Sequence, residues 1–535
     1  MHLNHLLASL SARLRRQEGF TMVTVLGVMM VGTLFTTAAV AAANGDIFGS
    51  QNDVDSKGAL AAAEAGVNDY QFHLDRDLTY WSKCTSVPNP SAVNQRWNGS
   101  GVDPRKWRQV PGSEAKYAIE LLPANGSAEC STATPDTSMI DATSNTFRVR
   151  STGVARKGKR SLVATFKRRS FLDYVYFTDY ETQDPTFLAG YPNNYATWAA
   201  ANCVRWWRDG RGNQSQPGTN ASCQEINFVS QENLKGPFHS NDEILICGTP
   251  TFGDRGDDSI EVAGPAPNQT GQGWRACPSN PSSQPNFVGA WRPRSPVLQL
   301  PLSNAKLKTI ADPAYRFAGK TTIELQGNTL KVNGVSKAWP PNGVLYVDSN
   351  GTGCKAYNLF NPYESYSQAN QCATVELKGN YNKDLTIAAA QDILVTGNVT
   401  RDTGSSGLLG LVANQFVRVY HPVTGSYNGD NDSCPNASNA PKNVRIDAAM
   451  LALTHVFVVD NYFCGDALGT LTVNGGIAQK FRGPVGTFSS SGDSSGFLKN
   501  YVYDRRLRNR EPPFFLDPVQ SSWAVLRQTE QVPAR

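Results

Sequence analysis

Residues 20–44 form an uncharged run that is rich in Val, Leu, Met, Ala and Phe. As an α-helix this run would extend about 37 Å, which is enough to cross the hydrocarbon core of a bilayer. Arg13, Arg15 and Arg16 precede the run. The positive-inside rule therefore predicts that residues 1–19 stay in the cytoplasm and that the bulk of the chain lies outside. A single N-terminal anchor with a large exported region is the constraint within which the rest must fold.

The composition of the chain predicts that the exported region is folded and rich in strands. The 535 residues are 40% hydrophobic and 18% charged, and 46 glycines and 31 prolines indicate many turns. The net charge of +5 is small for this length, and no dense basic patch is interleaved with aromatic residues. We therefore expect no nucleic acid partner.

All ten cysteines follow the apolar run, which favours disulfide bonds in an oxidising compartment. They are Cys84, Cys130, Cys203, Cys223, Cys247, Cys277, Cys354, Cys372, Cys434 and Cys464. Zinc is the alternative, but the chain has no CxxC pair and its six histidines are scattered. We expect no metal site and no cofactor. Three neighbouring pairs are the expected disulfides: Cys203 with Cys223, Cys354 with Cys372, and Cys434 with Cys464.

The segment "RRQEGFTMVTVL" before and into the apolar run resembles the class III leader of type IV prepilins and pseudopilins. The resemblance implies that a prepilin peptidase cuts between Gly19 and Phe20, N-methylates Phe20 and leaves the anchor on the mature protein. An ordinary signal peptide, cut within "AAVAAANGD" at residues 38–46, is the alternative. A plain anchor would also fit the apolar run.

Position 24 departs from the pattern of this family. Major pilins usually carry a glutamate five residues into the mature chain, whereas this chain has Thr24. A carboxylate without a partner is costly in an apolar environment, so its absence favours a minor subunit over a major shaft subunit. Gly27 and Gly32 would permit close helix contacts during assembly, although glycines are common in membrane helices.

Residues 55–78 predict an amphipathic helix that continues the anchor. Its expected apolar stripe consists of Leu60, Ala63, Val67, Tyr70 and Leu74. We expect Gly45 and Gly49 to loosen the joint between the anchor and this helix. The phrase "AAEAG" at residues 62–66 is similar to the N-terminal region of PilX-like minor pilins.

The remaining chain divides into three expected regions: a small β-rich subdomain at 81–170, a β-rich head at 171–380, and a β-solenoid-like region with a C-terminal cap at 381–525. They follow the leader at 1–19 and the helix at 20–80, whose membrane part is 20–43. Between residues 380 and 488, short apolar strands alternate with polar steps such as Ala-Gln-Asp and Ala-Asn-Gln. An ordinary β-sandwich is the alternative. The expected fold is α+β, with one helix and a head that includes a right-handed β-solenoid.

The phrases "FLDYVYFTDYET" and "LKGPFHSNDEILICG" resemble the head region of PilX-like pilus-assembly proteins. They bring His239, Asp242 and Asp179 into consideration as a site. The more economical interpretation is a turn that leads into a strand, in which these side chains satisfy backbone groups.

Two functions remain open from the sequence. The favoured one is a minor subunit of a type IV pilus or related pseudopilus, with its position at the tip or in the shaft left open and with other pilins and prepilin peptidase as partners. It would lie in the cytoplasmic membrane before assembly and then at the pilus or cell surface, where a glycan or protein receptor is a further partner. The alternative is a tethered β-solenoid enzyme acting on polysaccharide. We expect no catalytic residues, because no nucleophile, phosphate or metal motif is present and Asp384, Asp392 and Asp447 are not paired by a repeat.

Overall fold

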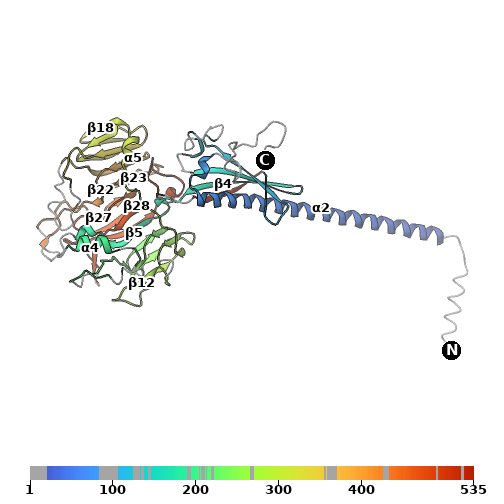
Figure 1. Cartoon of the computed structure of the whole chain (residues 1–535), viewed down its shortest axis with the longest axis horizontal. Helices are drawn as coiled ribbons and strands as arrows, with labels where there is room; N and C mark the ends of the chain where they lie inside the picture. Colours follow the sequence, from blue (N-terminus) through green and yellow to red (C-terminus); the bar gives the residue numbers. More distant parts are fainter. Residues whose placement is uncertain are drawn as a thin grey trace, which may run out of the picture. The chain divides into compact units, whose positions relative to one another are not determined.

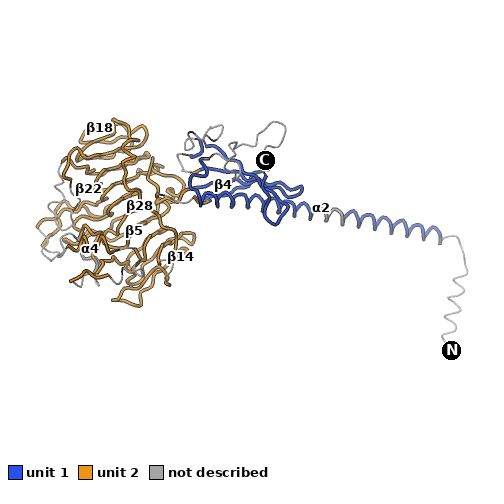
Figure 2. Tube along the Cα trace, viewed as in Figure 1, with its two compact units in different colours: residues 1–140, 147–166, 525–535 blue, residues 141–146, 167–524 orange. Residues whose placement is uncertain are grey.

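The computed structural model describes residues 21–83, 107–124, 130, 133, 138–141, 146–188, 194–203, 205–206, 211, 214–218, 222–265, 270–354, 357, 370–425, 433–489, 492–519 and 523–535. The chain forms two compact units, which Figure 2 distinguishes by colour. Unit 1 comprises residues 1–140, 147–166 and 525–535, and unit 2 comprises residues 141–146 and 167–524. The chain therefore leaves unit 1 twice and returns to it twice, first for the short segment 141–146 and then for residues 167–524.

The described part of unit 1 begins with a helix, α2 (Thr21–Arg76), followed by the short helix η1 (Tyr80–Lys83). At 56 residues α2 is about 84 Å long. The expected loosening at Gly45 and Gly49 does not occur, because the helix runs through both glycines without a break. A glycine in a helix interior costs only about 1 kcal/mol, which the many flanking Ala, Leu and Met residues offset.

The second half of α2 packs on a five-stranded sheet. The strands are, in spatial order, β1 (Arg108–Gln109), β2 (Lys116–Leu122), β3 (Thr146–Ala155), β4 (Gly158–Arg168) and β31 (Trp523–Gln531). Strands β1, β2 and β3 pair antiparallel. The expected stripe of α2 is buried at Ala63, Val67, Tyr70 and Leu74, whereas Leu60 is half-buried and Ala59 takes the core position beside it.

A glycine on β3 sets the distance between the sheet and the helix. A Cβ at Gly153 would lie 2.1 Å from the carbonyl oxygen of Ala59 and 2.4 Å from the backbone nitrogen of Ala63. Only glycine therefore lets the strand lie directly against the α2 backbone. About two turns beyond Ala63, the ring of Tyr70 packs 5.7 Å from Phe166, measured between ring centroids.

Most strands of unit 2 pair in parallel with one strand on each side, and a stretch of chain that adds one strand to each series of paired strands is called a coil here. One series of paired strands, here called face A, is in spatial order β15 (Arg316–Ala318), β19 (Val344–Asp348), β21 (Leu385–Ala389), β23 (Leu409–Ala413), β26 (Ala449–Ala452), β28 (Ala467–Arg482), β5 (Tyr176–Gln183), β8 (Phe238–Ser240), β11 (Ser259–Val262) and β14 (Ala290–Pro293).

A second series, face B, runs alongside. Its parallel strands are β16 (Thr321–Gly327), β20 (Thr374–Tyr381), β22 (Asp392–Arg401), β24 (Val417–Val419), β25 (Arg445–Ile446), β27 (Phe457–Val459), the first half of β28, β30 (Gly492–Tyr503), β7 (Asn233–Lys235), β10 (Thr251–Phe252) and β13 (Asn286–Phe287). A third, shorter series joins β6 (Phe228–Val229), β9 (Ile244–Cys247) and β12 (Trp274–Ala276).

Additional elements decorate the coils. The antiparallel strands β17 (Thr329–Val332) and β18 (Val335–Ala338) extend from β16, and β29 (Gly486–Ser489) pairs antiparallel with β30. Two short helices, α4 (Tyr195–Asn202) and α5 (Ala305–Ile310), complete the set that Figure 1 labels.

The order of the coils in space differs from their order in the sequence. Strand β28 pairs with β26 on one side and with β5 on the other, although about 300 residues separate β5 from β28 in the chain. Figure 1 shows β28 and β5 next to each other. The chain thus starts in the middle of the stack at β5, builds to one end at β14, restarts at the other end with β15, and returns to β28.

One ladder of inward side chains runs through this junction and unites the two halves. In spatial order its buried members are Leu345, Ile387, Leu411, Met450, Ile477, Tyr176, Phe238 and Ile260. The rings of Tyr176 and Phe238 stack with their centroids 5.4 Å apart. Because each coil buries its apolar residues against the next, neither half covers its core at the junction without the other.

A buried guanidinium reinforces the junction. Arg482 on β28 pairs with Glu181 on β5 at 3.3 Å and with Glu232 at 3.2 Å. It also donates hydrogen bonds of 3.0 Å to the carbonyl oxygens of Ile226 and Asn227. All three charged groups are almost fully buried.

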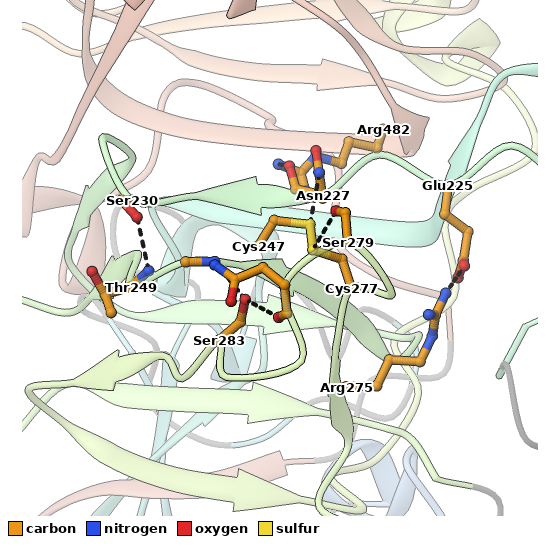
Figure 3. The surroundings of a disulfide bond; sticks show 12 residues. Glu225, Asn227, Ser230, Cys247, Thr249, Arg275, Cys277, Ser279, Ser283 and Arg482 are labelled. Carbon is orange, nitrogen blue, oxygen red and sulfur yellow. Dashed lines mark hydrogen bonds and ion pairs between the residues drawn. A yellow bond between two sulfur atoms is a disulfide. The ribbon is translucent and has the colours of Figure 1, made fainter. Parts of the chain in front are cut away.

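Four disulfides of unit 2 join sequence neighbours. They are Cys203–Cys223, Cys247–Cys277, Cys354–Cys372 and Cys434–Cys464. Three of these are the pairings that sequence proximity predicts. Figure 3 shows Cys247–Cys277 with Asn227, whose amide donates to the Cys247 sulfur at 2.8 Å. In unit 1, Cys130 is also disulfide-bonded, and Cys84 lies outside the described residues.

We expect Arg482→Met to lower the free energy of unfolding of unit 2 by about 3–5 kcal/mol, because Glu181 stays buried without Arg482 as its cation and Glu232 keeps only Lys499 as a cation among the described residues. Urea denaturation of the detergent-solubilised chain, followed by tryptophan fluorescence, measures this change.

Arg508→Met is the matched control. Arg508 lies 3.7 Å from Asp257, and both side chains are more than half exposed, so its loss should cost under about 1 kcal/mol. Equal losses in the two variants would contradict a structural role for the Arg482 cluster.

Candidate functional site

The first half of α2 is an exposed apolar surface. The segment Met22–Ala42 is long and apolar enough to cross a membrane, and none of it is buried. The exposed fractions are 74% for Met22, 73% for Val28 and 73% for Phe35. An apolar surface of this extent requires a partner, which can be lipid or other apolar helices.

The polar atoms of this segment suit an apolar environment. The hydroxyl groups of Thr33, Thr36 and Thr37 donate to helix carbonyls three or four residues earlier, at 2.9–3.0 Å. A hydroxyl that is satisfied within its own helix needs no water. The expected assembly residues Thr24, Gly27 and Gly32 all lie on this half of α2, and space is open around both glycines.

The expected processing site cannot be placed. Gly19 and Phe20 lie outside the described residues. Cleavage there stays a prediction from the sequence.

His239, Asp242 and Asp179, which the sequence brought into consideration, lie close together but face the protein interior. Their exposed fractions are 0%, 0% and 6%. Asn241 links two of them, because its amide nitrogen donates to Asp179 at 2.7 Å and its amide oxygen lies 3.0 Å from the Nε2 of His239. Asp242 accepts hydrogen bonds from the backbone nitrogens of Glu181 and Trp206. These side chains hold turns and strands in place, as the more economical interpretation predicts.

Glu261 on β11 completes this cluster, and no pattern in the sequence indicates it. Its carboxylate lies 3.1 Å from Nδ1 of His239 and accepts from Tyr174 at 2.9 Å and from Ser259 at 2.6 Å. Burial acts to raise the pKa of Glu261, but the hydrogen bond with His239 and the charges of His239 and Arg169 lower it to about 2. Glu261 is therefore an ionised structural group.

A groove on the outside of face B is the candidate binding site. Its volume is about 560 Å³. Its floor includes the in-register row Thr322, Glu376, Leu394 and Arg418, which come from β16, β20, β22 and β24. Because the four strands are parallel and in register, this row crosses the coils at right angles to the strands.

The hairpin β16–β17 supplies one side of the groove. Lys331 and Gly334 line it, and Lys331 is the cross-strand partner of Glu324. Glu324 is in register with Lys378 on the next coil. Lys320 pairs with Glu376 at 2.7 Å. Acidic and basic groups therefore alternate across the coils.

A buried ion cluster fixes the far end of the floor. Arg418 lies 3.3 Å from Asp392 and 3.0 Å from Asp460, and the ring of Tyr357 lies over its guanidinium at 4.4 Å from the centroid. Burial raises the pKa of Asp460 to about 6, although Arg418 opposes the shift. Arg418 is only 1% exposed, so it presents one edge to the groove and cannot swing away.

The three aspartates that the sequence singled out are not brought together. Asp392 belongs to the Arg418 cluster, Asp447 pairs with Arg445 at 2.8 Å, and Asp384 pairs with Arg510 at 2.8 Å. Sequence reasoning missed the groove itself. The available signal was the alternation in "TTIELQ" and "TVELK", which places Thr322, Glu324, Glu376 and Lys378 on the outer face of their strands.

Comparisons with known proteins give little guidance. No protein-family model matches the chain, and no curated protein matches it. Among solved structures, the competence-associated pilin ComZ from Thermus thermophilus is similar at 13% identity, over 90% of this chain and 98% of that chain. The TM-score is 0.24, and a likeness at this level carries no argument about fold or function.

Glu261→Gln should destabilise unit 2 in a pH-dependent way. The pKa of Glu261 is depressed in the folded state. The stability that the ionised carboxylate contributes is therefore fully present above the ordinary pKa of 4.5 and is lost as the pH falls toward 2. Near pH 7 we expect the substitution to lower the free energy of unfolding by about 3 kcal/mol. Urea denaturation between pH 7 and pH 2.5 measures it, and Glu114→Gln, at an exposed position, is the control. A pH-independent difference would contradict this account.

Proposed function

We propose that this chain is a minor, tip-located subunit of a type IV pilus or related pseudopilus, with a large extracellular head. One observation carries the proposal. A single unbroken helix exposes an apolar half, Met22–Ala42, and packs its other half on the sheet of unit 1. The helix thus joins an anchor directly to a folded head.

This arrangement suits a subunit that moves from a membrane into a filament. A uniformly apolar helix is satisfied equally by lipid and by the dry core of a helical filament, so transfer between them is feasible. Thr24 adds no carboxylate that would need a cationic partner there. A head of this size would be hard to repeat along a narrow shaft, which favours the tip.

The stacked coils of unit 2 favour a β-solenoid over the alternative of a β-sandwich. Within face A and within face B, neighbouring strands pair in parallel, whereas a β-sandwich consists of antiparallel sheets. The polar steps that the sequence indicated also stack, since Gln415 donates its backbone N–H to Gln391 and Thr454 donates its own to Asn414, both at 3.0 Å.

Processing tests the role in a filament. Full-length chain is expressed with and without an active prepilin peptidase, and the mature N-terminus is determined by mass spectrometry. We expect a cut between Gly19 and Phe20 and N-methylation of Phe20. A chain that keeps its leader beside the active peptidase, or that is cut within residues 38–46 instead, contradicts the proposal.

A tethered enzyme acting on polysaccharide is the second candidate. The observation in its favour is that two carboxylates, Glu324 and Glu376, line one groove, since glycoside hydrolases use a pair of acids. Release of new reducing ends from glycans by the wild-type chain, and its loss in Glu324→Gln and Glu376→Gln, would support this candidate over the structural one.

A further inference from the structure

We propose that the face B groove binds a linear, uncharged oligosaccharide that lies across the coils. This inference concerns the outer surface of unit 2 and holds whether or not α2 enters a filament. The proposal follows from the repeat distance of the groove, its mixture of donors and acceptors, and its balance of charge.

The floor repeats at the spacing of the coils. Four neighbouring parallel strands, β16, β20, β22 and β24, form the floor of the groove. At about 4.8 Å per strand they span about 14 Å. The spacing between neighbouring strands is comparable to the length of one sugar ring in an extended chain, so successive coils can contact successive rings.

The lining offers what a polyhydroxylated chain needs. Sugar hydroxyls act as both donors and acceptors, and the groove supplies hydroxyls from Thr322 and Thr396 beside carboxylates and ammonium groups. Leu394 and the ring of Tyr420 add apolar surface for the C–H faces of sugar rings.

The charges of the groove oppose a polyanion. The four cations Lys320, Lys331, Lys378 and Arg418 are matched by four carboxylates, those of Glu324, Glu376, Asp392 and Asp460. The net charge of the groove, counted together with the two buried aspartates that pair with Arg418, is therefore zero. DNA or an acidic polymer would gain no long-range attraction and would meet Glu324 and Glu376 directly.

The backbone of the floor opposes an extended peptide. Strands β16, β20, β22 and β24 already pair with each other in parallel, so a peptide cannot join the sheet as an added strand within the groove. The floor is also rigid, because the Arg418 cluster is buried. A preorganised floor loses little freedom when it binds a chain.

The test uses the full chain in detergent micelles. Its probes are fluorescently labelled linear tetramers of glucose, mannose, galactose and N-acetylglucosamine, a uronate tetramer, and duplex DNA. Binding is measured by fluorescence polarisation and repeated with two variants. Thr322→Trp fills the floor from an exposed position, and Thr329→Trp places the same side chain at an exposed position outside the groove.

We expect at least one uncharged tetramer to bind, with affinity reduced about tenfold or more in Thr322→Trp and unchanged in Thr329→Trp. Circular dichroism confirms that both variants are folded. The proposal is overturned if no uncharged tetramer binds, if the uronate tetramer or DNA binds more tightly than every uncharged probe, or if Thr322→Trp binds like the wild type.

Discussion

The contact between α2 and the sheet of unit 1 determines how the rest of the chain can act. Gly153 lets β3 approach the α2 backbone, and Ala63, Val67 and Tyr70 become fully buried. This contact occupies only the second half of the helix. Among the described residues, the first half remains exposed along Met22–Ala42, so its partner must be lipid or another chain. The two halves of α2 therefore differ: the first half exposes an apolar surface, and the second half is part of the core of unit 1.

The junction of β28 with β5 gives unit 2 its unusual chain order. The strands that connect unit 2 to unit 1, β4 and β31, are neighbours in one sheet, so the chain has to leave and return at nearly the same place. A stack that ran in sequence order would have its first and last coils at opposite ends. Because β5, at the start of the stack in the sequence, pairs with β28 near its end, the chain enters and leaves the stack at neighbouring coils. This arrangement also makes the stack depend on a non-covalent contact, which Arg482 and the apolar ladder stabilise.

Local features of the fold were accessible from the sequence, whereas long-range ones were not. The apolar run, the stripe at Val67, Tyr70 and Leu74, and three disulfide pairings depend on residues that are near each other in the chain. The continuity of α2 through Gly45 was not predicted, because the helix propensity of the long flanking segments outweighs single glycines. The pairing of β28 with β5 and the position of Glu261 depend on contacts between distant segments. The groove illustrates both cases, since alternation indicates which side chains face outward but not which strands lie side by side.

The measurement that tests the central claim most directly is site-specific photo-cross-linking in pilus-producing cells. A photoreactive residue replaces Val28, which is 73% exposed on the apolar half of α2, and in a control replaces Leu302, which is 94% exposed in unit 2. The account predicts that illumination joins the Val28 variant to other pilin subunits in sheared filaments and that the Leu302 variant forms no such product. Cross-links from position 28 to lipid alone, with the protein absent from the filaments, would contradict it.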